Sequence, residues 1–219
     1  MHIHLPKGHL SSLRGWLLEL LTITCGILIA LSLEGMGEWR HNRQLLHEAR
    51  TNILAELRDN HRSISNPLEV IPDELANLRR VITLCRQERA RRGSVDLKKE
   101  ENLSLAFTLA TVSSTSWNTA QAIGAVSLMD YQEIKKYTAV YEIQAETMAI
   151  QRQTMDKWLQ VQRVASLLGD PPSLKDVSTS DIADIERGAS EAISYTSALR
   201  TLETELQKQY EGLLEPRTD

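Results

Sequence analysis

The apolar run from Trp16 to Leu33 limits what this chain can fold into more than any other feature of the sequence. A second tryptophan, Trp39, follows the run. If this stretch is helical, Trp16 and Trp39 lie roughly 34 Å apart, close to the hydrocarbon thickness of a bilayer. Indole rings favour the headgroup level, so the two tryptophans are predicted to mark the membrane interfaces. We therefore predict one transmembrane helix over residues 15–38, after a short polar tail over residues 1–14.

A cleaved signal peptide is the alternative interpretation of this run. The apolar part is longer than the usual apolar core of a signal peptide, and no small-x-small cleavage site precedes a loop. The helical pattern instead continues directly into GEWRHNRQLLHEARTNILAELRDN. Basic residues flank both ends of the run, so the positive-inside rule barely separates the two orientations. Between them, we favour a periplasmic C-terminal domain.

Six residues share one face of the predicted span, because successive residues turn by about 100° along a helix. We call them the small-residue stripe: Glu19, Thr22, Gly26, Ala30, Glu34 and Gly37. Gly26 and Ala30 form a small-xxx-small pair, which lets another helix approach closely in lipid. The simpler interpretation is that the glutamates are interfacial and the small residues occur by chance. We predict a helix-packing face, with membrane lipid and other transmembrane helices as partners.

The N-terminal part is also partly similar to type IV pilins. Gly15-Trp16-Leu17-Leu18-Glu19, followed by Gly26-Ile27-Leu28-Ile29-Ala30, resembles a pilin's processing glycine, early glutamate and apolar helix. Glu19 is the fourth residue after Gly15, where pilins place this glutamate fifth. The sequence after the helix shows no strand-rich head. A pilin-like subunit is therefore the lesser alternative.

Beyond the span the sequence predicts helices only. Aromatic residues make up 5% of the chain, and the abundant Leu, Ala, Glu, Gln and Arg favour helices over sheets. A seven-residue spacing connects four positions after the span: Trp39, Leu46, Ile53 and Asn60. This spacing predicts a juxtamembrane helix that continues the span over residues 39–66 and breaks at Asn66-Pro67.

A helical bundle is predicted over residues 67–215, with a tail over residues 216–219. Its first helix has Pro72 in its first turn, and two short helices follow, the second entered through Ser114 or Thr115. Asp130 is expected to cap a long helix that ends at Gly169-Asp170-Pro171-Pro172, and a final helix begins near Ser180. The predicted fold is all-α: an N-terminal transmembrane helix continuing into a long helix, followed by an antiparallel bundle.

Three stretches together resemble a group of uncharacterised bacterial single-pass membrane proteins. They are ELLTITCGILIALSLEGMGEWR, LHEARTNILAELRDN and STSWNTAQAIGAVSLMDYQEIKKYTAVYEIQ. The shared features are an apolar helix ending in Trp, an adjoining charged helix, and a block of the form S-x-x-W-x-x-A-x-x-x-G-A-x-x-x-M-x-Y. The resemblance covers most of the chain and implies a bacterial inner-membrane location. It implies no activity.

The central block predicts a tight helix crossing. Trp117, Ala120 and Gly124 are expected along one helical face, where a bulky side chain adjoins residues small enough for close approach. Tyr131, Tyr137 and Tyr141 could supply hydroxyl groups to a polar pocket beneath Trp117. We favour Trp117 as a core plug of the bundle, with a small-ligand pocket as the alternative.

No pattern of catalytic or metal-binding residues occurs in the sequence. His41, His47 and His61 do not share the i, i+4 face that a helical metal site needs, and no Gly-rich phosphate loop is present. The formal net charge of −4 gives no electrostatic footprint for nucleic acid. We therefore expect no cofactor, no metal and no enzymatic activity.

The expected function is association in the membrane. The sequence favours a non-catalytic helical protein that acts as a structural or accessory subunit of a larger inner-membrane complex, or as a homo-oligomer. The alternative is a sensory or ligand-binding helical domain on a membrane tether.

Overall fold

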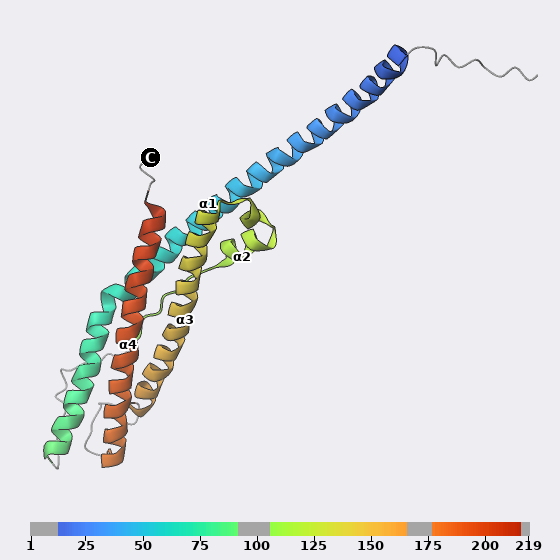
Figure 1. Ribbon diagram of the computed structural model, residues 1–219. Helices are drawn as coiled ribbons and strands as arrows, with labels where there is room; N and C mark the ends of the chain where they lie inside the picture. Colours follow the sequence, from blue (N-terminus) through green and yellow to red (C-terminus); the bar gives the residue numbers. More distant parts are fainter. Residues whose placement is uncertain (1–12, 92–105, 166–176, 216–219) are drawn as a thin grey trace, which may run out of the picture. The chain divides into compact units, whose positions relative to one another are not determined.

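The computed structural model describes residues 13–91, 106–165 and 177–215. Within these ranges every regular element is helical, which confirms the predicted all-α class (Figure 1). The elements are α1 (Leu13–Arg91), α2 (Thr115–Ala122), the short 3-10 helix η1 (Ala125–Leu128), α3 (Tyr131–Ala165) and α4 (Thr179–Leu214). The chain divides into two compact units, Met1–Glu48 and Ala49–Asp219.

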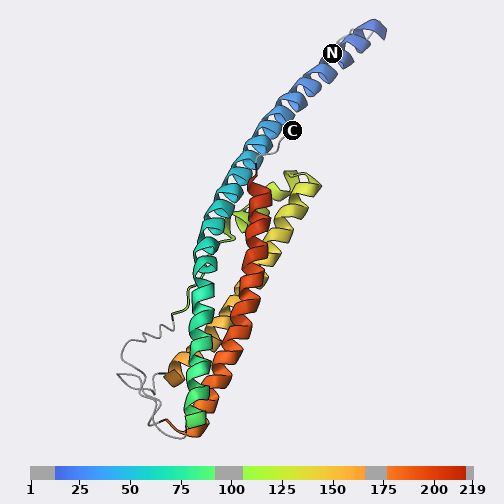
Figure 2. The same cartoon turned by 90° about the vertical axis from the view of Figure 1, so that its left-hand side faces the viewer.

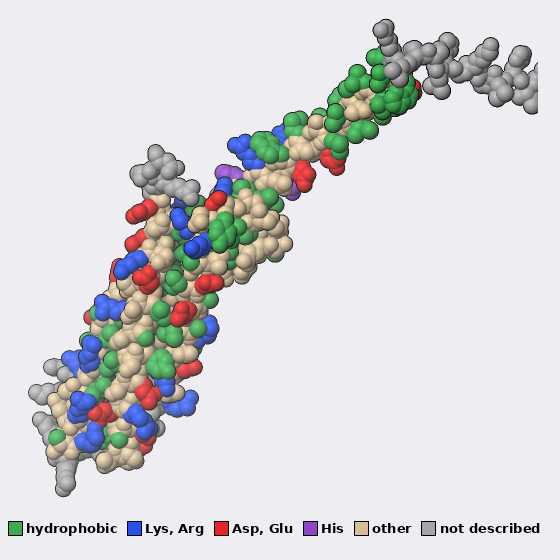
Figure 3. Space-filling view, viewed as in Figure 1, with side chains coloured by type: hydrophobic (Ala, Val, Ile, Leu, Met, Phe, Trp, Pro, Cys, Tyr) green, Lys and Arg blue, Asp and Glu red, His purple; other side chains and the backbone are tan. Residues whose placement is uncertain are grey.

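The described part of the first unit is the N-terminal portion of α1. Every residue from Gly15 to His41 is exposed, including the large side chains of Trp16, Ile29 and Leu33. Apolar side chains are prominent on the face of this segment shown in Figure 3. The segment is long and apolar enough to cross a membrane, a criterion that a signal sequence also meets.

The second unit is built on three long helices whose buried positions alternate in steps of three and four residues, as in coiled coils. In α3 the buried positions with this spacing are Tyr137, Val140, Gln144, Thr147, Gln151, Thr154, Trp158 and Val161. In α4 they are Ile185, Ala189, Ala192, Thr196, Leu199, Glu203, Leu206 and Tyr210. The C-terminal part of α1 has the same periodicity from Ile53 onward. The three helices lie side by side in both views (Figures 1 and 2).

The predicted helix break at Asn66-Pro67 is wrong. Helix α1 continues through both Pro67 and Pro72. Pro67 is itself buried and keeps the core spacing between Ile64 and Ile71, which are both fully buried. Packing on either side therefore holds the helix together although proline lacks the N–H group of a regular helical residue.

The directions of the helices follow from their side-chain pairs. Arg50 and Asn60 of α1 bind Glu133 and Gln144 of α3, so these two helices run in the same direction. Helix α4 runs antiparallel to both (Figure 1). The bundle is therefore antiparallel between α4 and each of the other two helices, and parallel between α1 and α3. The parallel pair is possible because the chain after α1 returns along the bundle before α3 begins.

Of the two short helices predicted between α1 and α3, the second is present as α2, and the first is absent from the described residues. Residues 106–114 form no regular element, whereas α2 begins at Thr115 with Ser114 as its N-cap, as expected. Asp130 caps α3 by accepting a hydrogen bond from the Gln132 N–H at 2.8 Å, which confirms that prediction. The predicted helix end at residues 169–172 lies outside the described residues.

Candidate functional site

Residues 106–114, the returning segment, are held by polar side chains of α1 and α3. Asn60 and Gln151 each bind both backbone polar groups of one residue, Ser113 and Ala110 respectively, at 2.7–3.0 Å. Glu74 accepts from the Thr108 N–H at 2.8 Å. Amide and carboxylate side chains thus take the place of a neighbouring strand for this segment.

A polar layer crosses the bundle where the returning segment ends. Its members are Glu56, Asn60, Ser113, Tyr141, Gln144 and Tyr210. Glu56 accepts hydrogen bonds from the Tyr141 hydroxyl at 2.7 Å and the Ser113 hydroxyl at 2.8 Å. Gln144 Oε1 accepts from Asn60 at 3.1 Å and from the Tyr210 hydroxyl at 2.7 Å. The layer connects all three long helices through buried hydrogen bonds.

An aromatic cluster lies against this layer. The Trp117 ring stacks on Tyr141 with ring centroids 5.5 Å apart and an interplanar angle of 9°, and it is tilted against Tyr137 at 5.9 Å. Trp117 and Ala120 are both buried. Trp117 therefore occupies the core of the bundle, with a tyrosine hydroxyl beneath it that is bonded to Glu56.

Two members of the predicted Trp117 group lie elsewhere. Helix α2 ends at Ala122, and Gly124 follows it in a left-handed conformation with φ of 77°, so it does not continue the helical face of Trp117. A side chain at this φ is disfavoured, which explains the glycine. Tyr131 is 73% exposed at the start of α3 and takes no part in the cluster.

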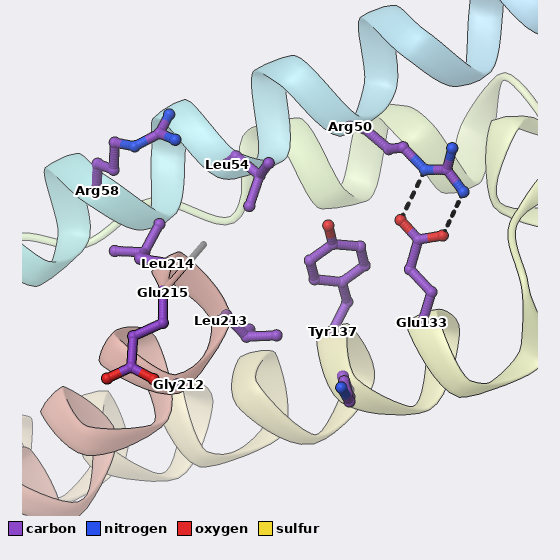
Figure 4. Close-up of a pocket in the computed structure, with 10 residues that line it drawn as sticks. Arg50, Leu54, Arg58, Glu133, Tyr137, Gly212, Leu213, Leu214 and Glu215 are labelled. Carbon is purple, nitrogen blue, oxygen red and sulfur yellow. Dashed lines mark hydrogen bonds and ion pairs between the residues drawn. The ribbon is translucent and has the colours of Figure 1, made fainter. Parts of the chain in front are cut away.

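A cleft of about 590 Å³ lies between α1, α3 and the end of α4 (Figure 4). Its lining residues are Arg50, Leu54, Arg58, Glu133, Lys136, Tyr137, Gly212, Leu213, Leu214 and Glu215. Arg50 binds Glu133 through two parallel hydrogen bonds of 2.8 and 2.6 Å. The bond to Glu133 raises the pKa of Arg50 further above its usual value, so this guanidinium stays charged.

The cleft has apolar walls and an excess of one basic side chain, because Arg50, Arg58 and Lys136 line it together with Glu133 and Glu215. Arg58 and Lys136 form no ion pair with any other residue that the structure describes, whereas Glu133 is already engaged by Arg50. Leu54, Leu213 and the ring of Tyr137 border the same space (Figure 4). Such a cleft fits a ligand with an anionic group and an apolar body.

The small-residue stripe is exposed along its whole length. Apart from the chain neighbours and the backbone of the same helix, nothing lies within 4 Å of a Cβ added at Gly26 or Gly37, so no other part of the described chain covers this face. The Thr22 hydroxyl donates to the Leu18 carbonyl of its own helix at 2.8 Å. Trp16 and Trp39 are also exposed. The helix-packing role of the stripe stays a prediction.

Sequence reasoning missed the buried polar core of the bundle and the cleft. A signal for the core was present, since Gln144, Gln151 and Trp158 are seven residues apart, as are Thr196, Glu203 and Tyr210. Polar residues at such positions interrupt an apolar seam and were therefore not recognised as core. The cleft depends on which helix ends meet, for which the sequence holds no local signal.

Comparison with family models, with curated proteins and with solved structures finds no match to this chain. The resemblance to bacterial single-pass membrane proteins therefore stays a prediction.

Proposed function

We propose that this protein is a membrane-anchored helical protein that works by association, as a structural or accessory subunit of a larger complex or as a homo-oligomer. The observation that carries the proposal is the exposure of every residue from Gly15 to His41 in α1. An apolar surface of this extent is not stable in water and requires lipid or partner helices around it.

The small-residue stripe is the face on which we place the partner helix. The remaining surface of the span carries mostly Leu and Ile, which lipid chains solvate well, whereas Gly26 and Ala30 allow backbones to approach closely. Glu19 and Glu34 on the same face are costly towards lipid and are better accommodated against another protein surface. We further propose a bacterial inner-membrane location with residues 49–219 in the periplasm.

The proposal is tested by cross-linking in native membranes, with leucine introduced on the stripe. Gly26→Leu and Ala30→Leu are expected to abolish a cross-linked species that the unaltered protein forms. Gly35→Leu is the matched control, because Gly35 lies nine residues from Gly26, on the opposite side of the helix, and a side chain added there also meets open space. A protein that stays monomeric, or variants that all behave alike, would disprove the proposal.

A second candidate function is ligand binding on a membrane tether. The observation that favours it is the cleft with Arg58 and Lys136 beside Leu54 and Leu213. We expect a medium-chain carboxylate to bind the full chain in micelles, measured by calorimetry, and Arg58→Gln or Lys136→Gln to weaken the binding. Lys135→Gln is the control, since Lys135 does not line the cleft. Equal binding by all variants would exclude this function. No observation within the described residues favours a pilin-like subunit.

A further inference from the structure

Two carboxyl groups lie in the core of the bundle, away from the cleft and the polar layer. Glu74 of α1 is 5% exposed and Glu203 of α4 is 0% exposed. Glu74 Oε1 accepts from the Thr108 N–H, but Glu74 Oε2 and both carboxyl oxygens of Glu203 have no hydrogen-bond partner among the described residues. Buried carboxylate oxygens without partners are rare because their desolvation is not compensated.

The register of α1 against α4 brings these two side chains together. His61 contacts Glu211, and Arg86 binds Glu186. Arg86 comes 25 residues after His61 in α1, and Glu186 comes 25 residues before Glu211 in α4, so the two helices run antiparallel with equal spacing between these contacts. In this register Glu203 lies opposite Glu69, five residues before Glu74. Side chains tilt towards the N-terminus of their own helix, and in antiparallel helices these directions oppose each other. The carboxyl groups of Glu74 and Glu203 therefore extend towards the same point.

No positive charge faces this point from the described elements packed around it. Helix α3 presents Gln151 and Thr154, which are buried and do not titrate, and the returning segment presents the Thr108 N–H. The charged side chains at neighbouring levels are all exposed: Glu69 and Asp73 of α1, Arg152 and Asp156 of α3, and Arg200 of α4. Burial, followed by the charge of Glu74, raises the pKa of Glu203 from 4.5 to about 7. Burial also raises the pKa of Glu74.

We propose that Glu74 and Glu203 form a proton-binding site, in which the folded bundle holds one proton between the two carboxyl groups. The bound proton turns one oxygen into a hydrogen-bond donor and lets an oxygen of the other carboxylate accept it. Titration then belongs to the pair rather than to either residue.

A proton fits this site better than a metal ion does. The carboxyl pair offers three free oxygens, whereas Ca²⁺ and Mg²⁺ take six or more oxygen ligands. The part of the chain that the structure describes also holds no group of three His, Cys, Asp or Glu side chains arranged for a metal. Binding of a proton makes the stability of the bundle depend on pH near neutrality.

The sign of this dependence is fixed by linkage. The folded bundle retains the proton up to a higher pH than the unfolded chain does, so its contribution to stability is complete below pH 4.5 and lost as the pH rises through about 7. We expect the unfolding equilibrium constant to rise on the order of 100-fold over this window relative to a variant without the site.

The test measures chemical unfolding of the full chain in detergent micelles from pH 4 to pH 9. Wild type and Glu205→Gln, an exposed neighbour on α4, should both lose stability across the window, whereas Glu203→Gln should not. The amide of this variant can donate permanently to Glu74. If Glu203→Gln does not fold, Glu74→Gln provides the same comparison.

Infrared spectroscopy at pH 6 gives an independent measurement. The carbonyl stretch of a protonated carboxylic acid should be present in wild type and Glu205→Gln and absent from Glu203→Gln. The proposal is overturned if all three proteins share one pH profile and one spectrum. It is also overturned if Mg²⁺ or Ca²⁺ stabilises wild type but not Glu203→Gln at pH 8, since the pair would then bind a metal.

Discussion

Asn60 binds both backbone polar groups of Ser113, accepting from its N–H at 2.8 Å and donating to its carbonyl at 2.7 Å. Gln151 does the same for Ala110, at 3.0 and 2.9 Å. One primary amide presents a donor and an acceptor side by side, which is the pattern that an adjacent strand would offer. The returning segment, residues 106–114, therefore needs no sheet to satisfy its backbone within a bundle of helices.

Replacing either amide by leucine should destabilise the second unit. Gln151→Leu leaves the N–H and the carbonyl of buried Ala110 without partners, at an expected cost of about 2–4 kcal/mol. Asn60→Leu leaves the Ser113 N–H without its acceptor, whereas Gln144 Nε2 still donates to the Ser113 carbonyl at 3.1 Å, so the expected cost is about 1–2 kcal/mol. The measurement is chemical unfolding of the full chain in micelles, followed by circular dichroism. Asn52→Leu and Gln153→Leu, both exposed, serve as matched controls with effects expected within about 0.5 kcal/mol. Equal stability of Asn60→Leu and Asn52→Leu would contradict the prediction.

A similar argument applies to Trp158, which is 1% exposed between α3 and α4. Its indole N–H donates to the Thr196 hydroxyl at 2.9 Å, and its ring stacks on Phe107 at 5.5 Å. Trp158→Phe should cost about 2 kcal/mol through lost volume and the lost hydrogen bond, and Thr196→Val about 1–2 kcal/mol through the unpaired indole. In a double-mutant cycle the two losses should be less than additive, because either change breaks the same bond. Strict additivity would show that the bond contributes nothing.

The two cysteines give a prediction that needs no substitution. Burial raises the pKa of the Cys85 thiol, so at pH 8 it stays protonated and unreactive in the folded bundle. Cys25 is exposed on the apolar segment of α1. A membrane-impermeant maleimide should therefore label neither cysteine in intact membranes, Cys85 because the bundle covers it and Cys25 because lipid does. Labelling of Cys25 without denaturant would argue against a span through that residue.

Helix starts could be predicted from the sequence where residues next to them in the chain determine them. Asp130 as the cap of α3 and the start of α2 after Ser114 depend on residues next to them in the chain. The continuation of α1 through Pro67 could not be predicted, because tertiary packing around Ile64 and Ile71 outweighs the local preference of proline.

The candidate sites were predicted less well than the helices. The Trp117–Tyr141 contact joins residues of one block that the sequence analysis singled out, and both side chains are buried. The pair of Glu74 and Glu203 joins positions far apart in the chain. So do the hydrogen bonds of α1 side chains to the backbone of residues 106–114. Such pairs depend on the register of α1 with α3 and α4, which the alternation of apolar residues does not specify.

The tyrosines provide a last prediction, at alkaline pH. Burial, and for Tyr141 the hydrogen bond to Glu56, raises the pKa of Tyr141 and Tyr210 well above the usual value near 10. The folded bundle keeps these two phenols neutral, whereas the unfolded chain ionises them. Their contribution to stability is thus complete below about pH 10 and is lost as the pH rises further.

Ultraviolet absorbance from the phenolates of Tyr141 and Tyr210 should therefore appear only as circular dichroism reports loss of helix. Tyr141→Phe should reduce the absorbance increase that accompanies this loss. Removal of the Glu56 carboxylate as Glu56→Gln should shift that increase to lower pH, because the Tyr141 hydroxyl and the Ser116 N–H lose a charged acceptor and the folded bundle is less stable. If Tyr141→Phe instead reduces an absorbance increase that occurs while the helices are intact, the polar layer is open to water.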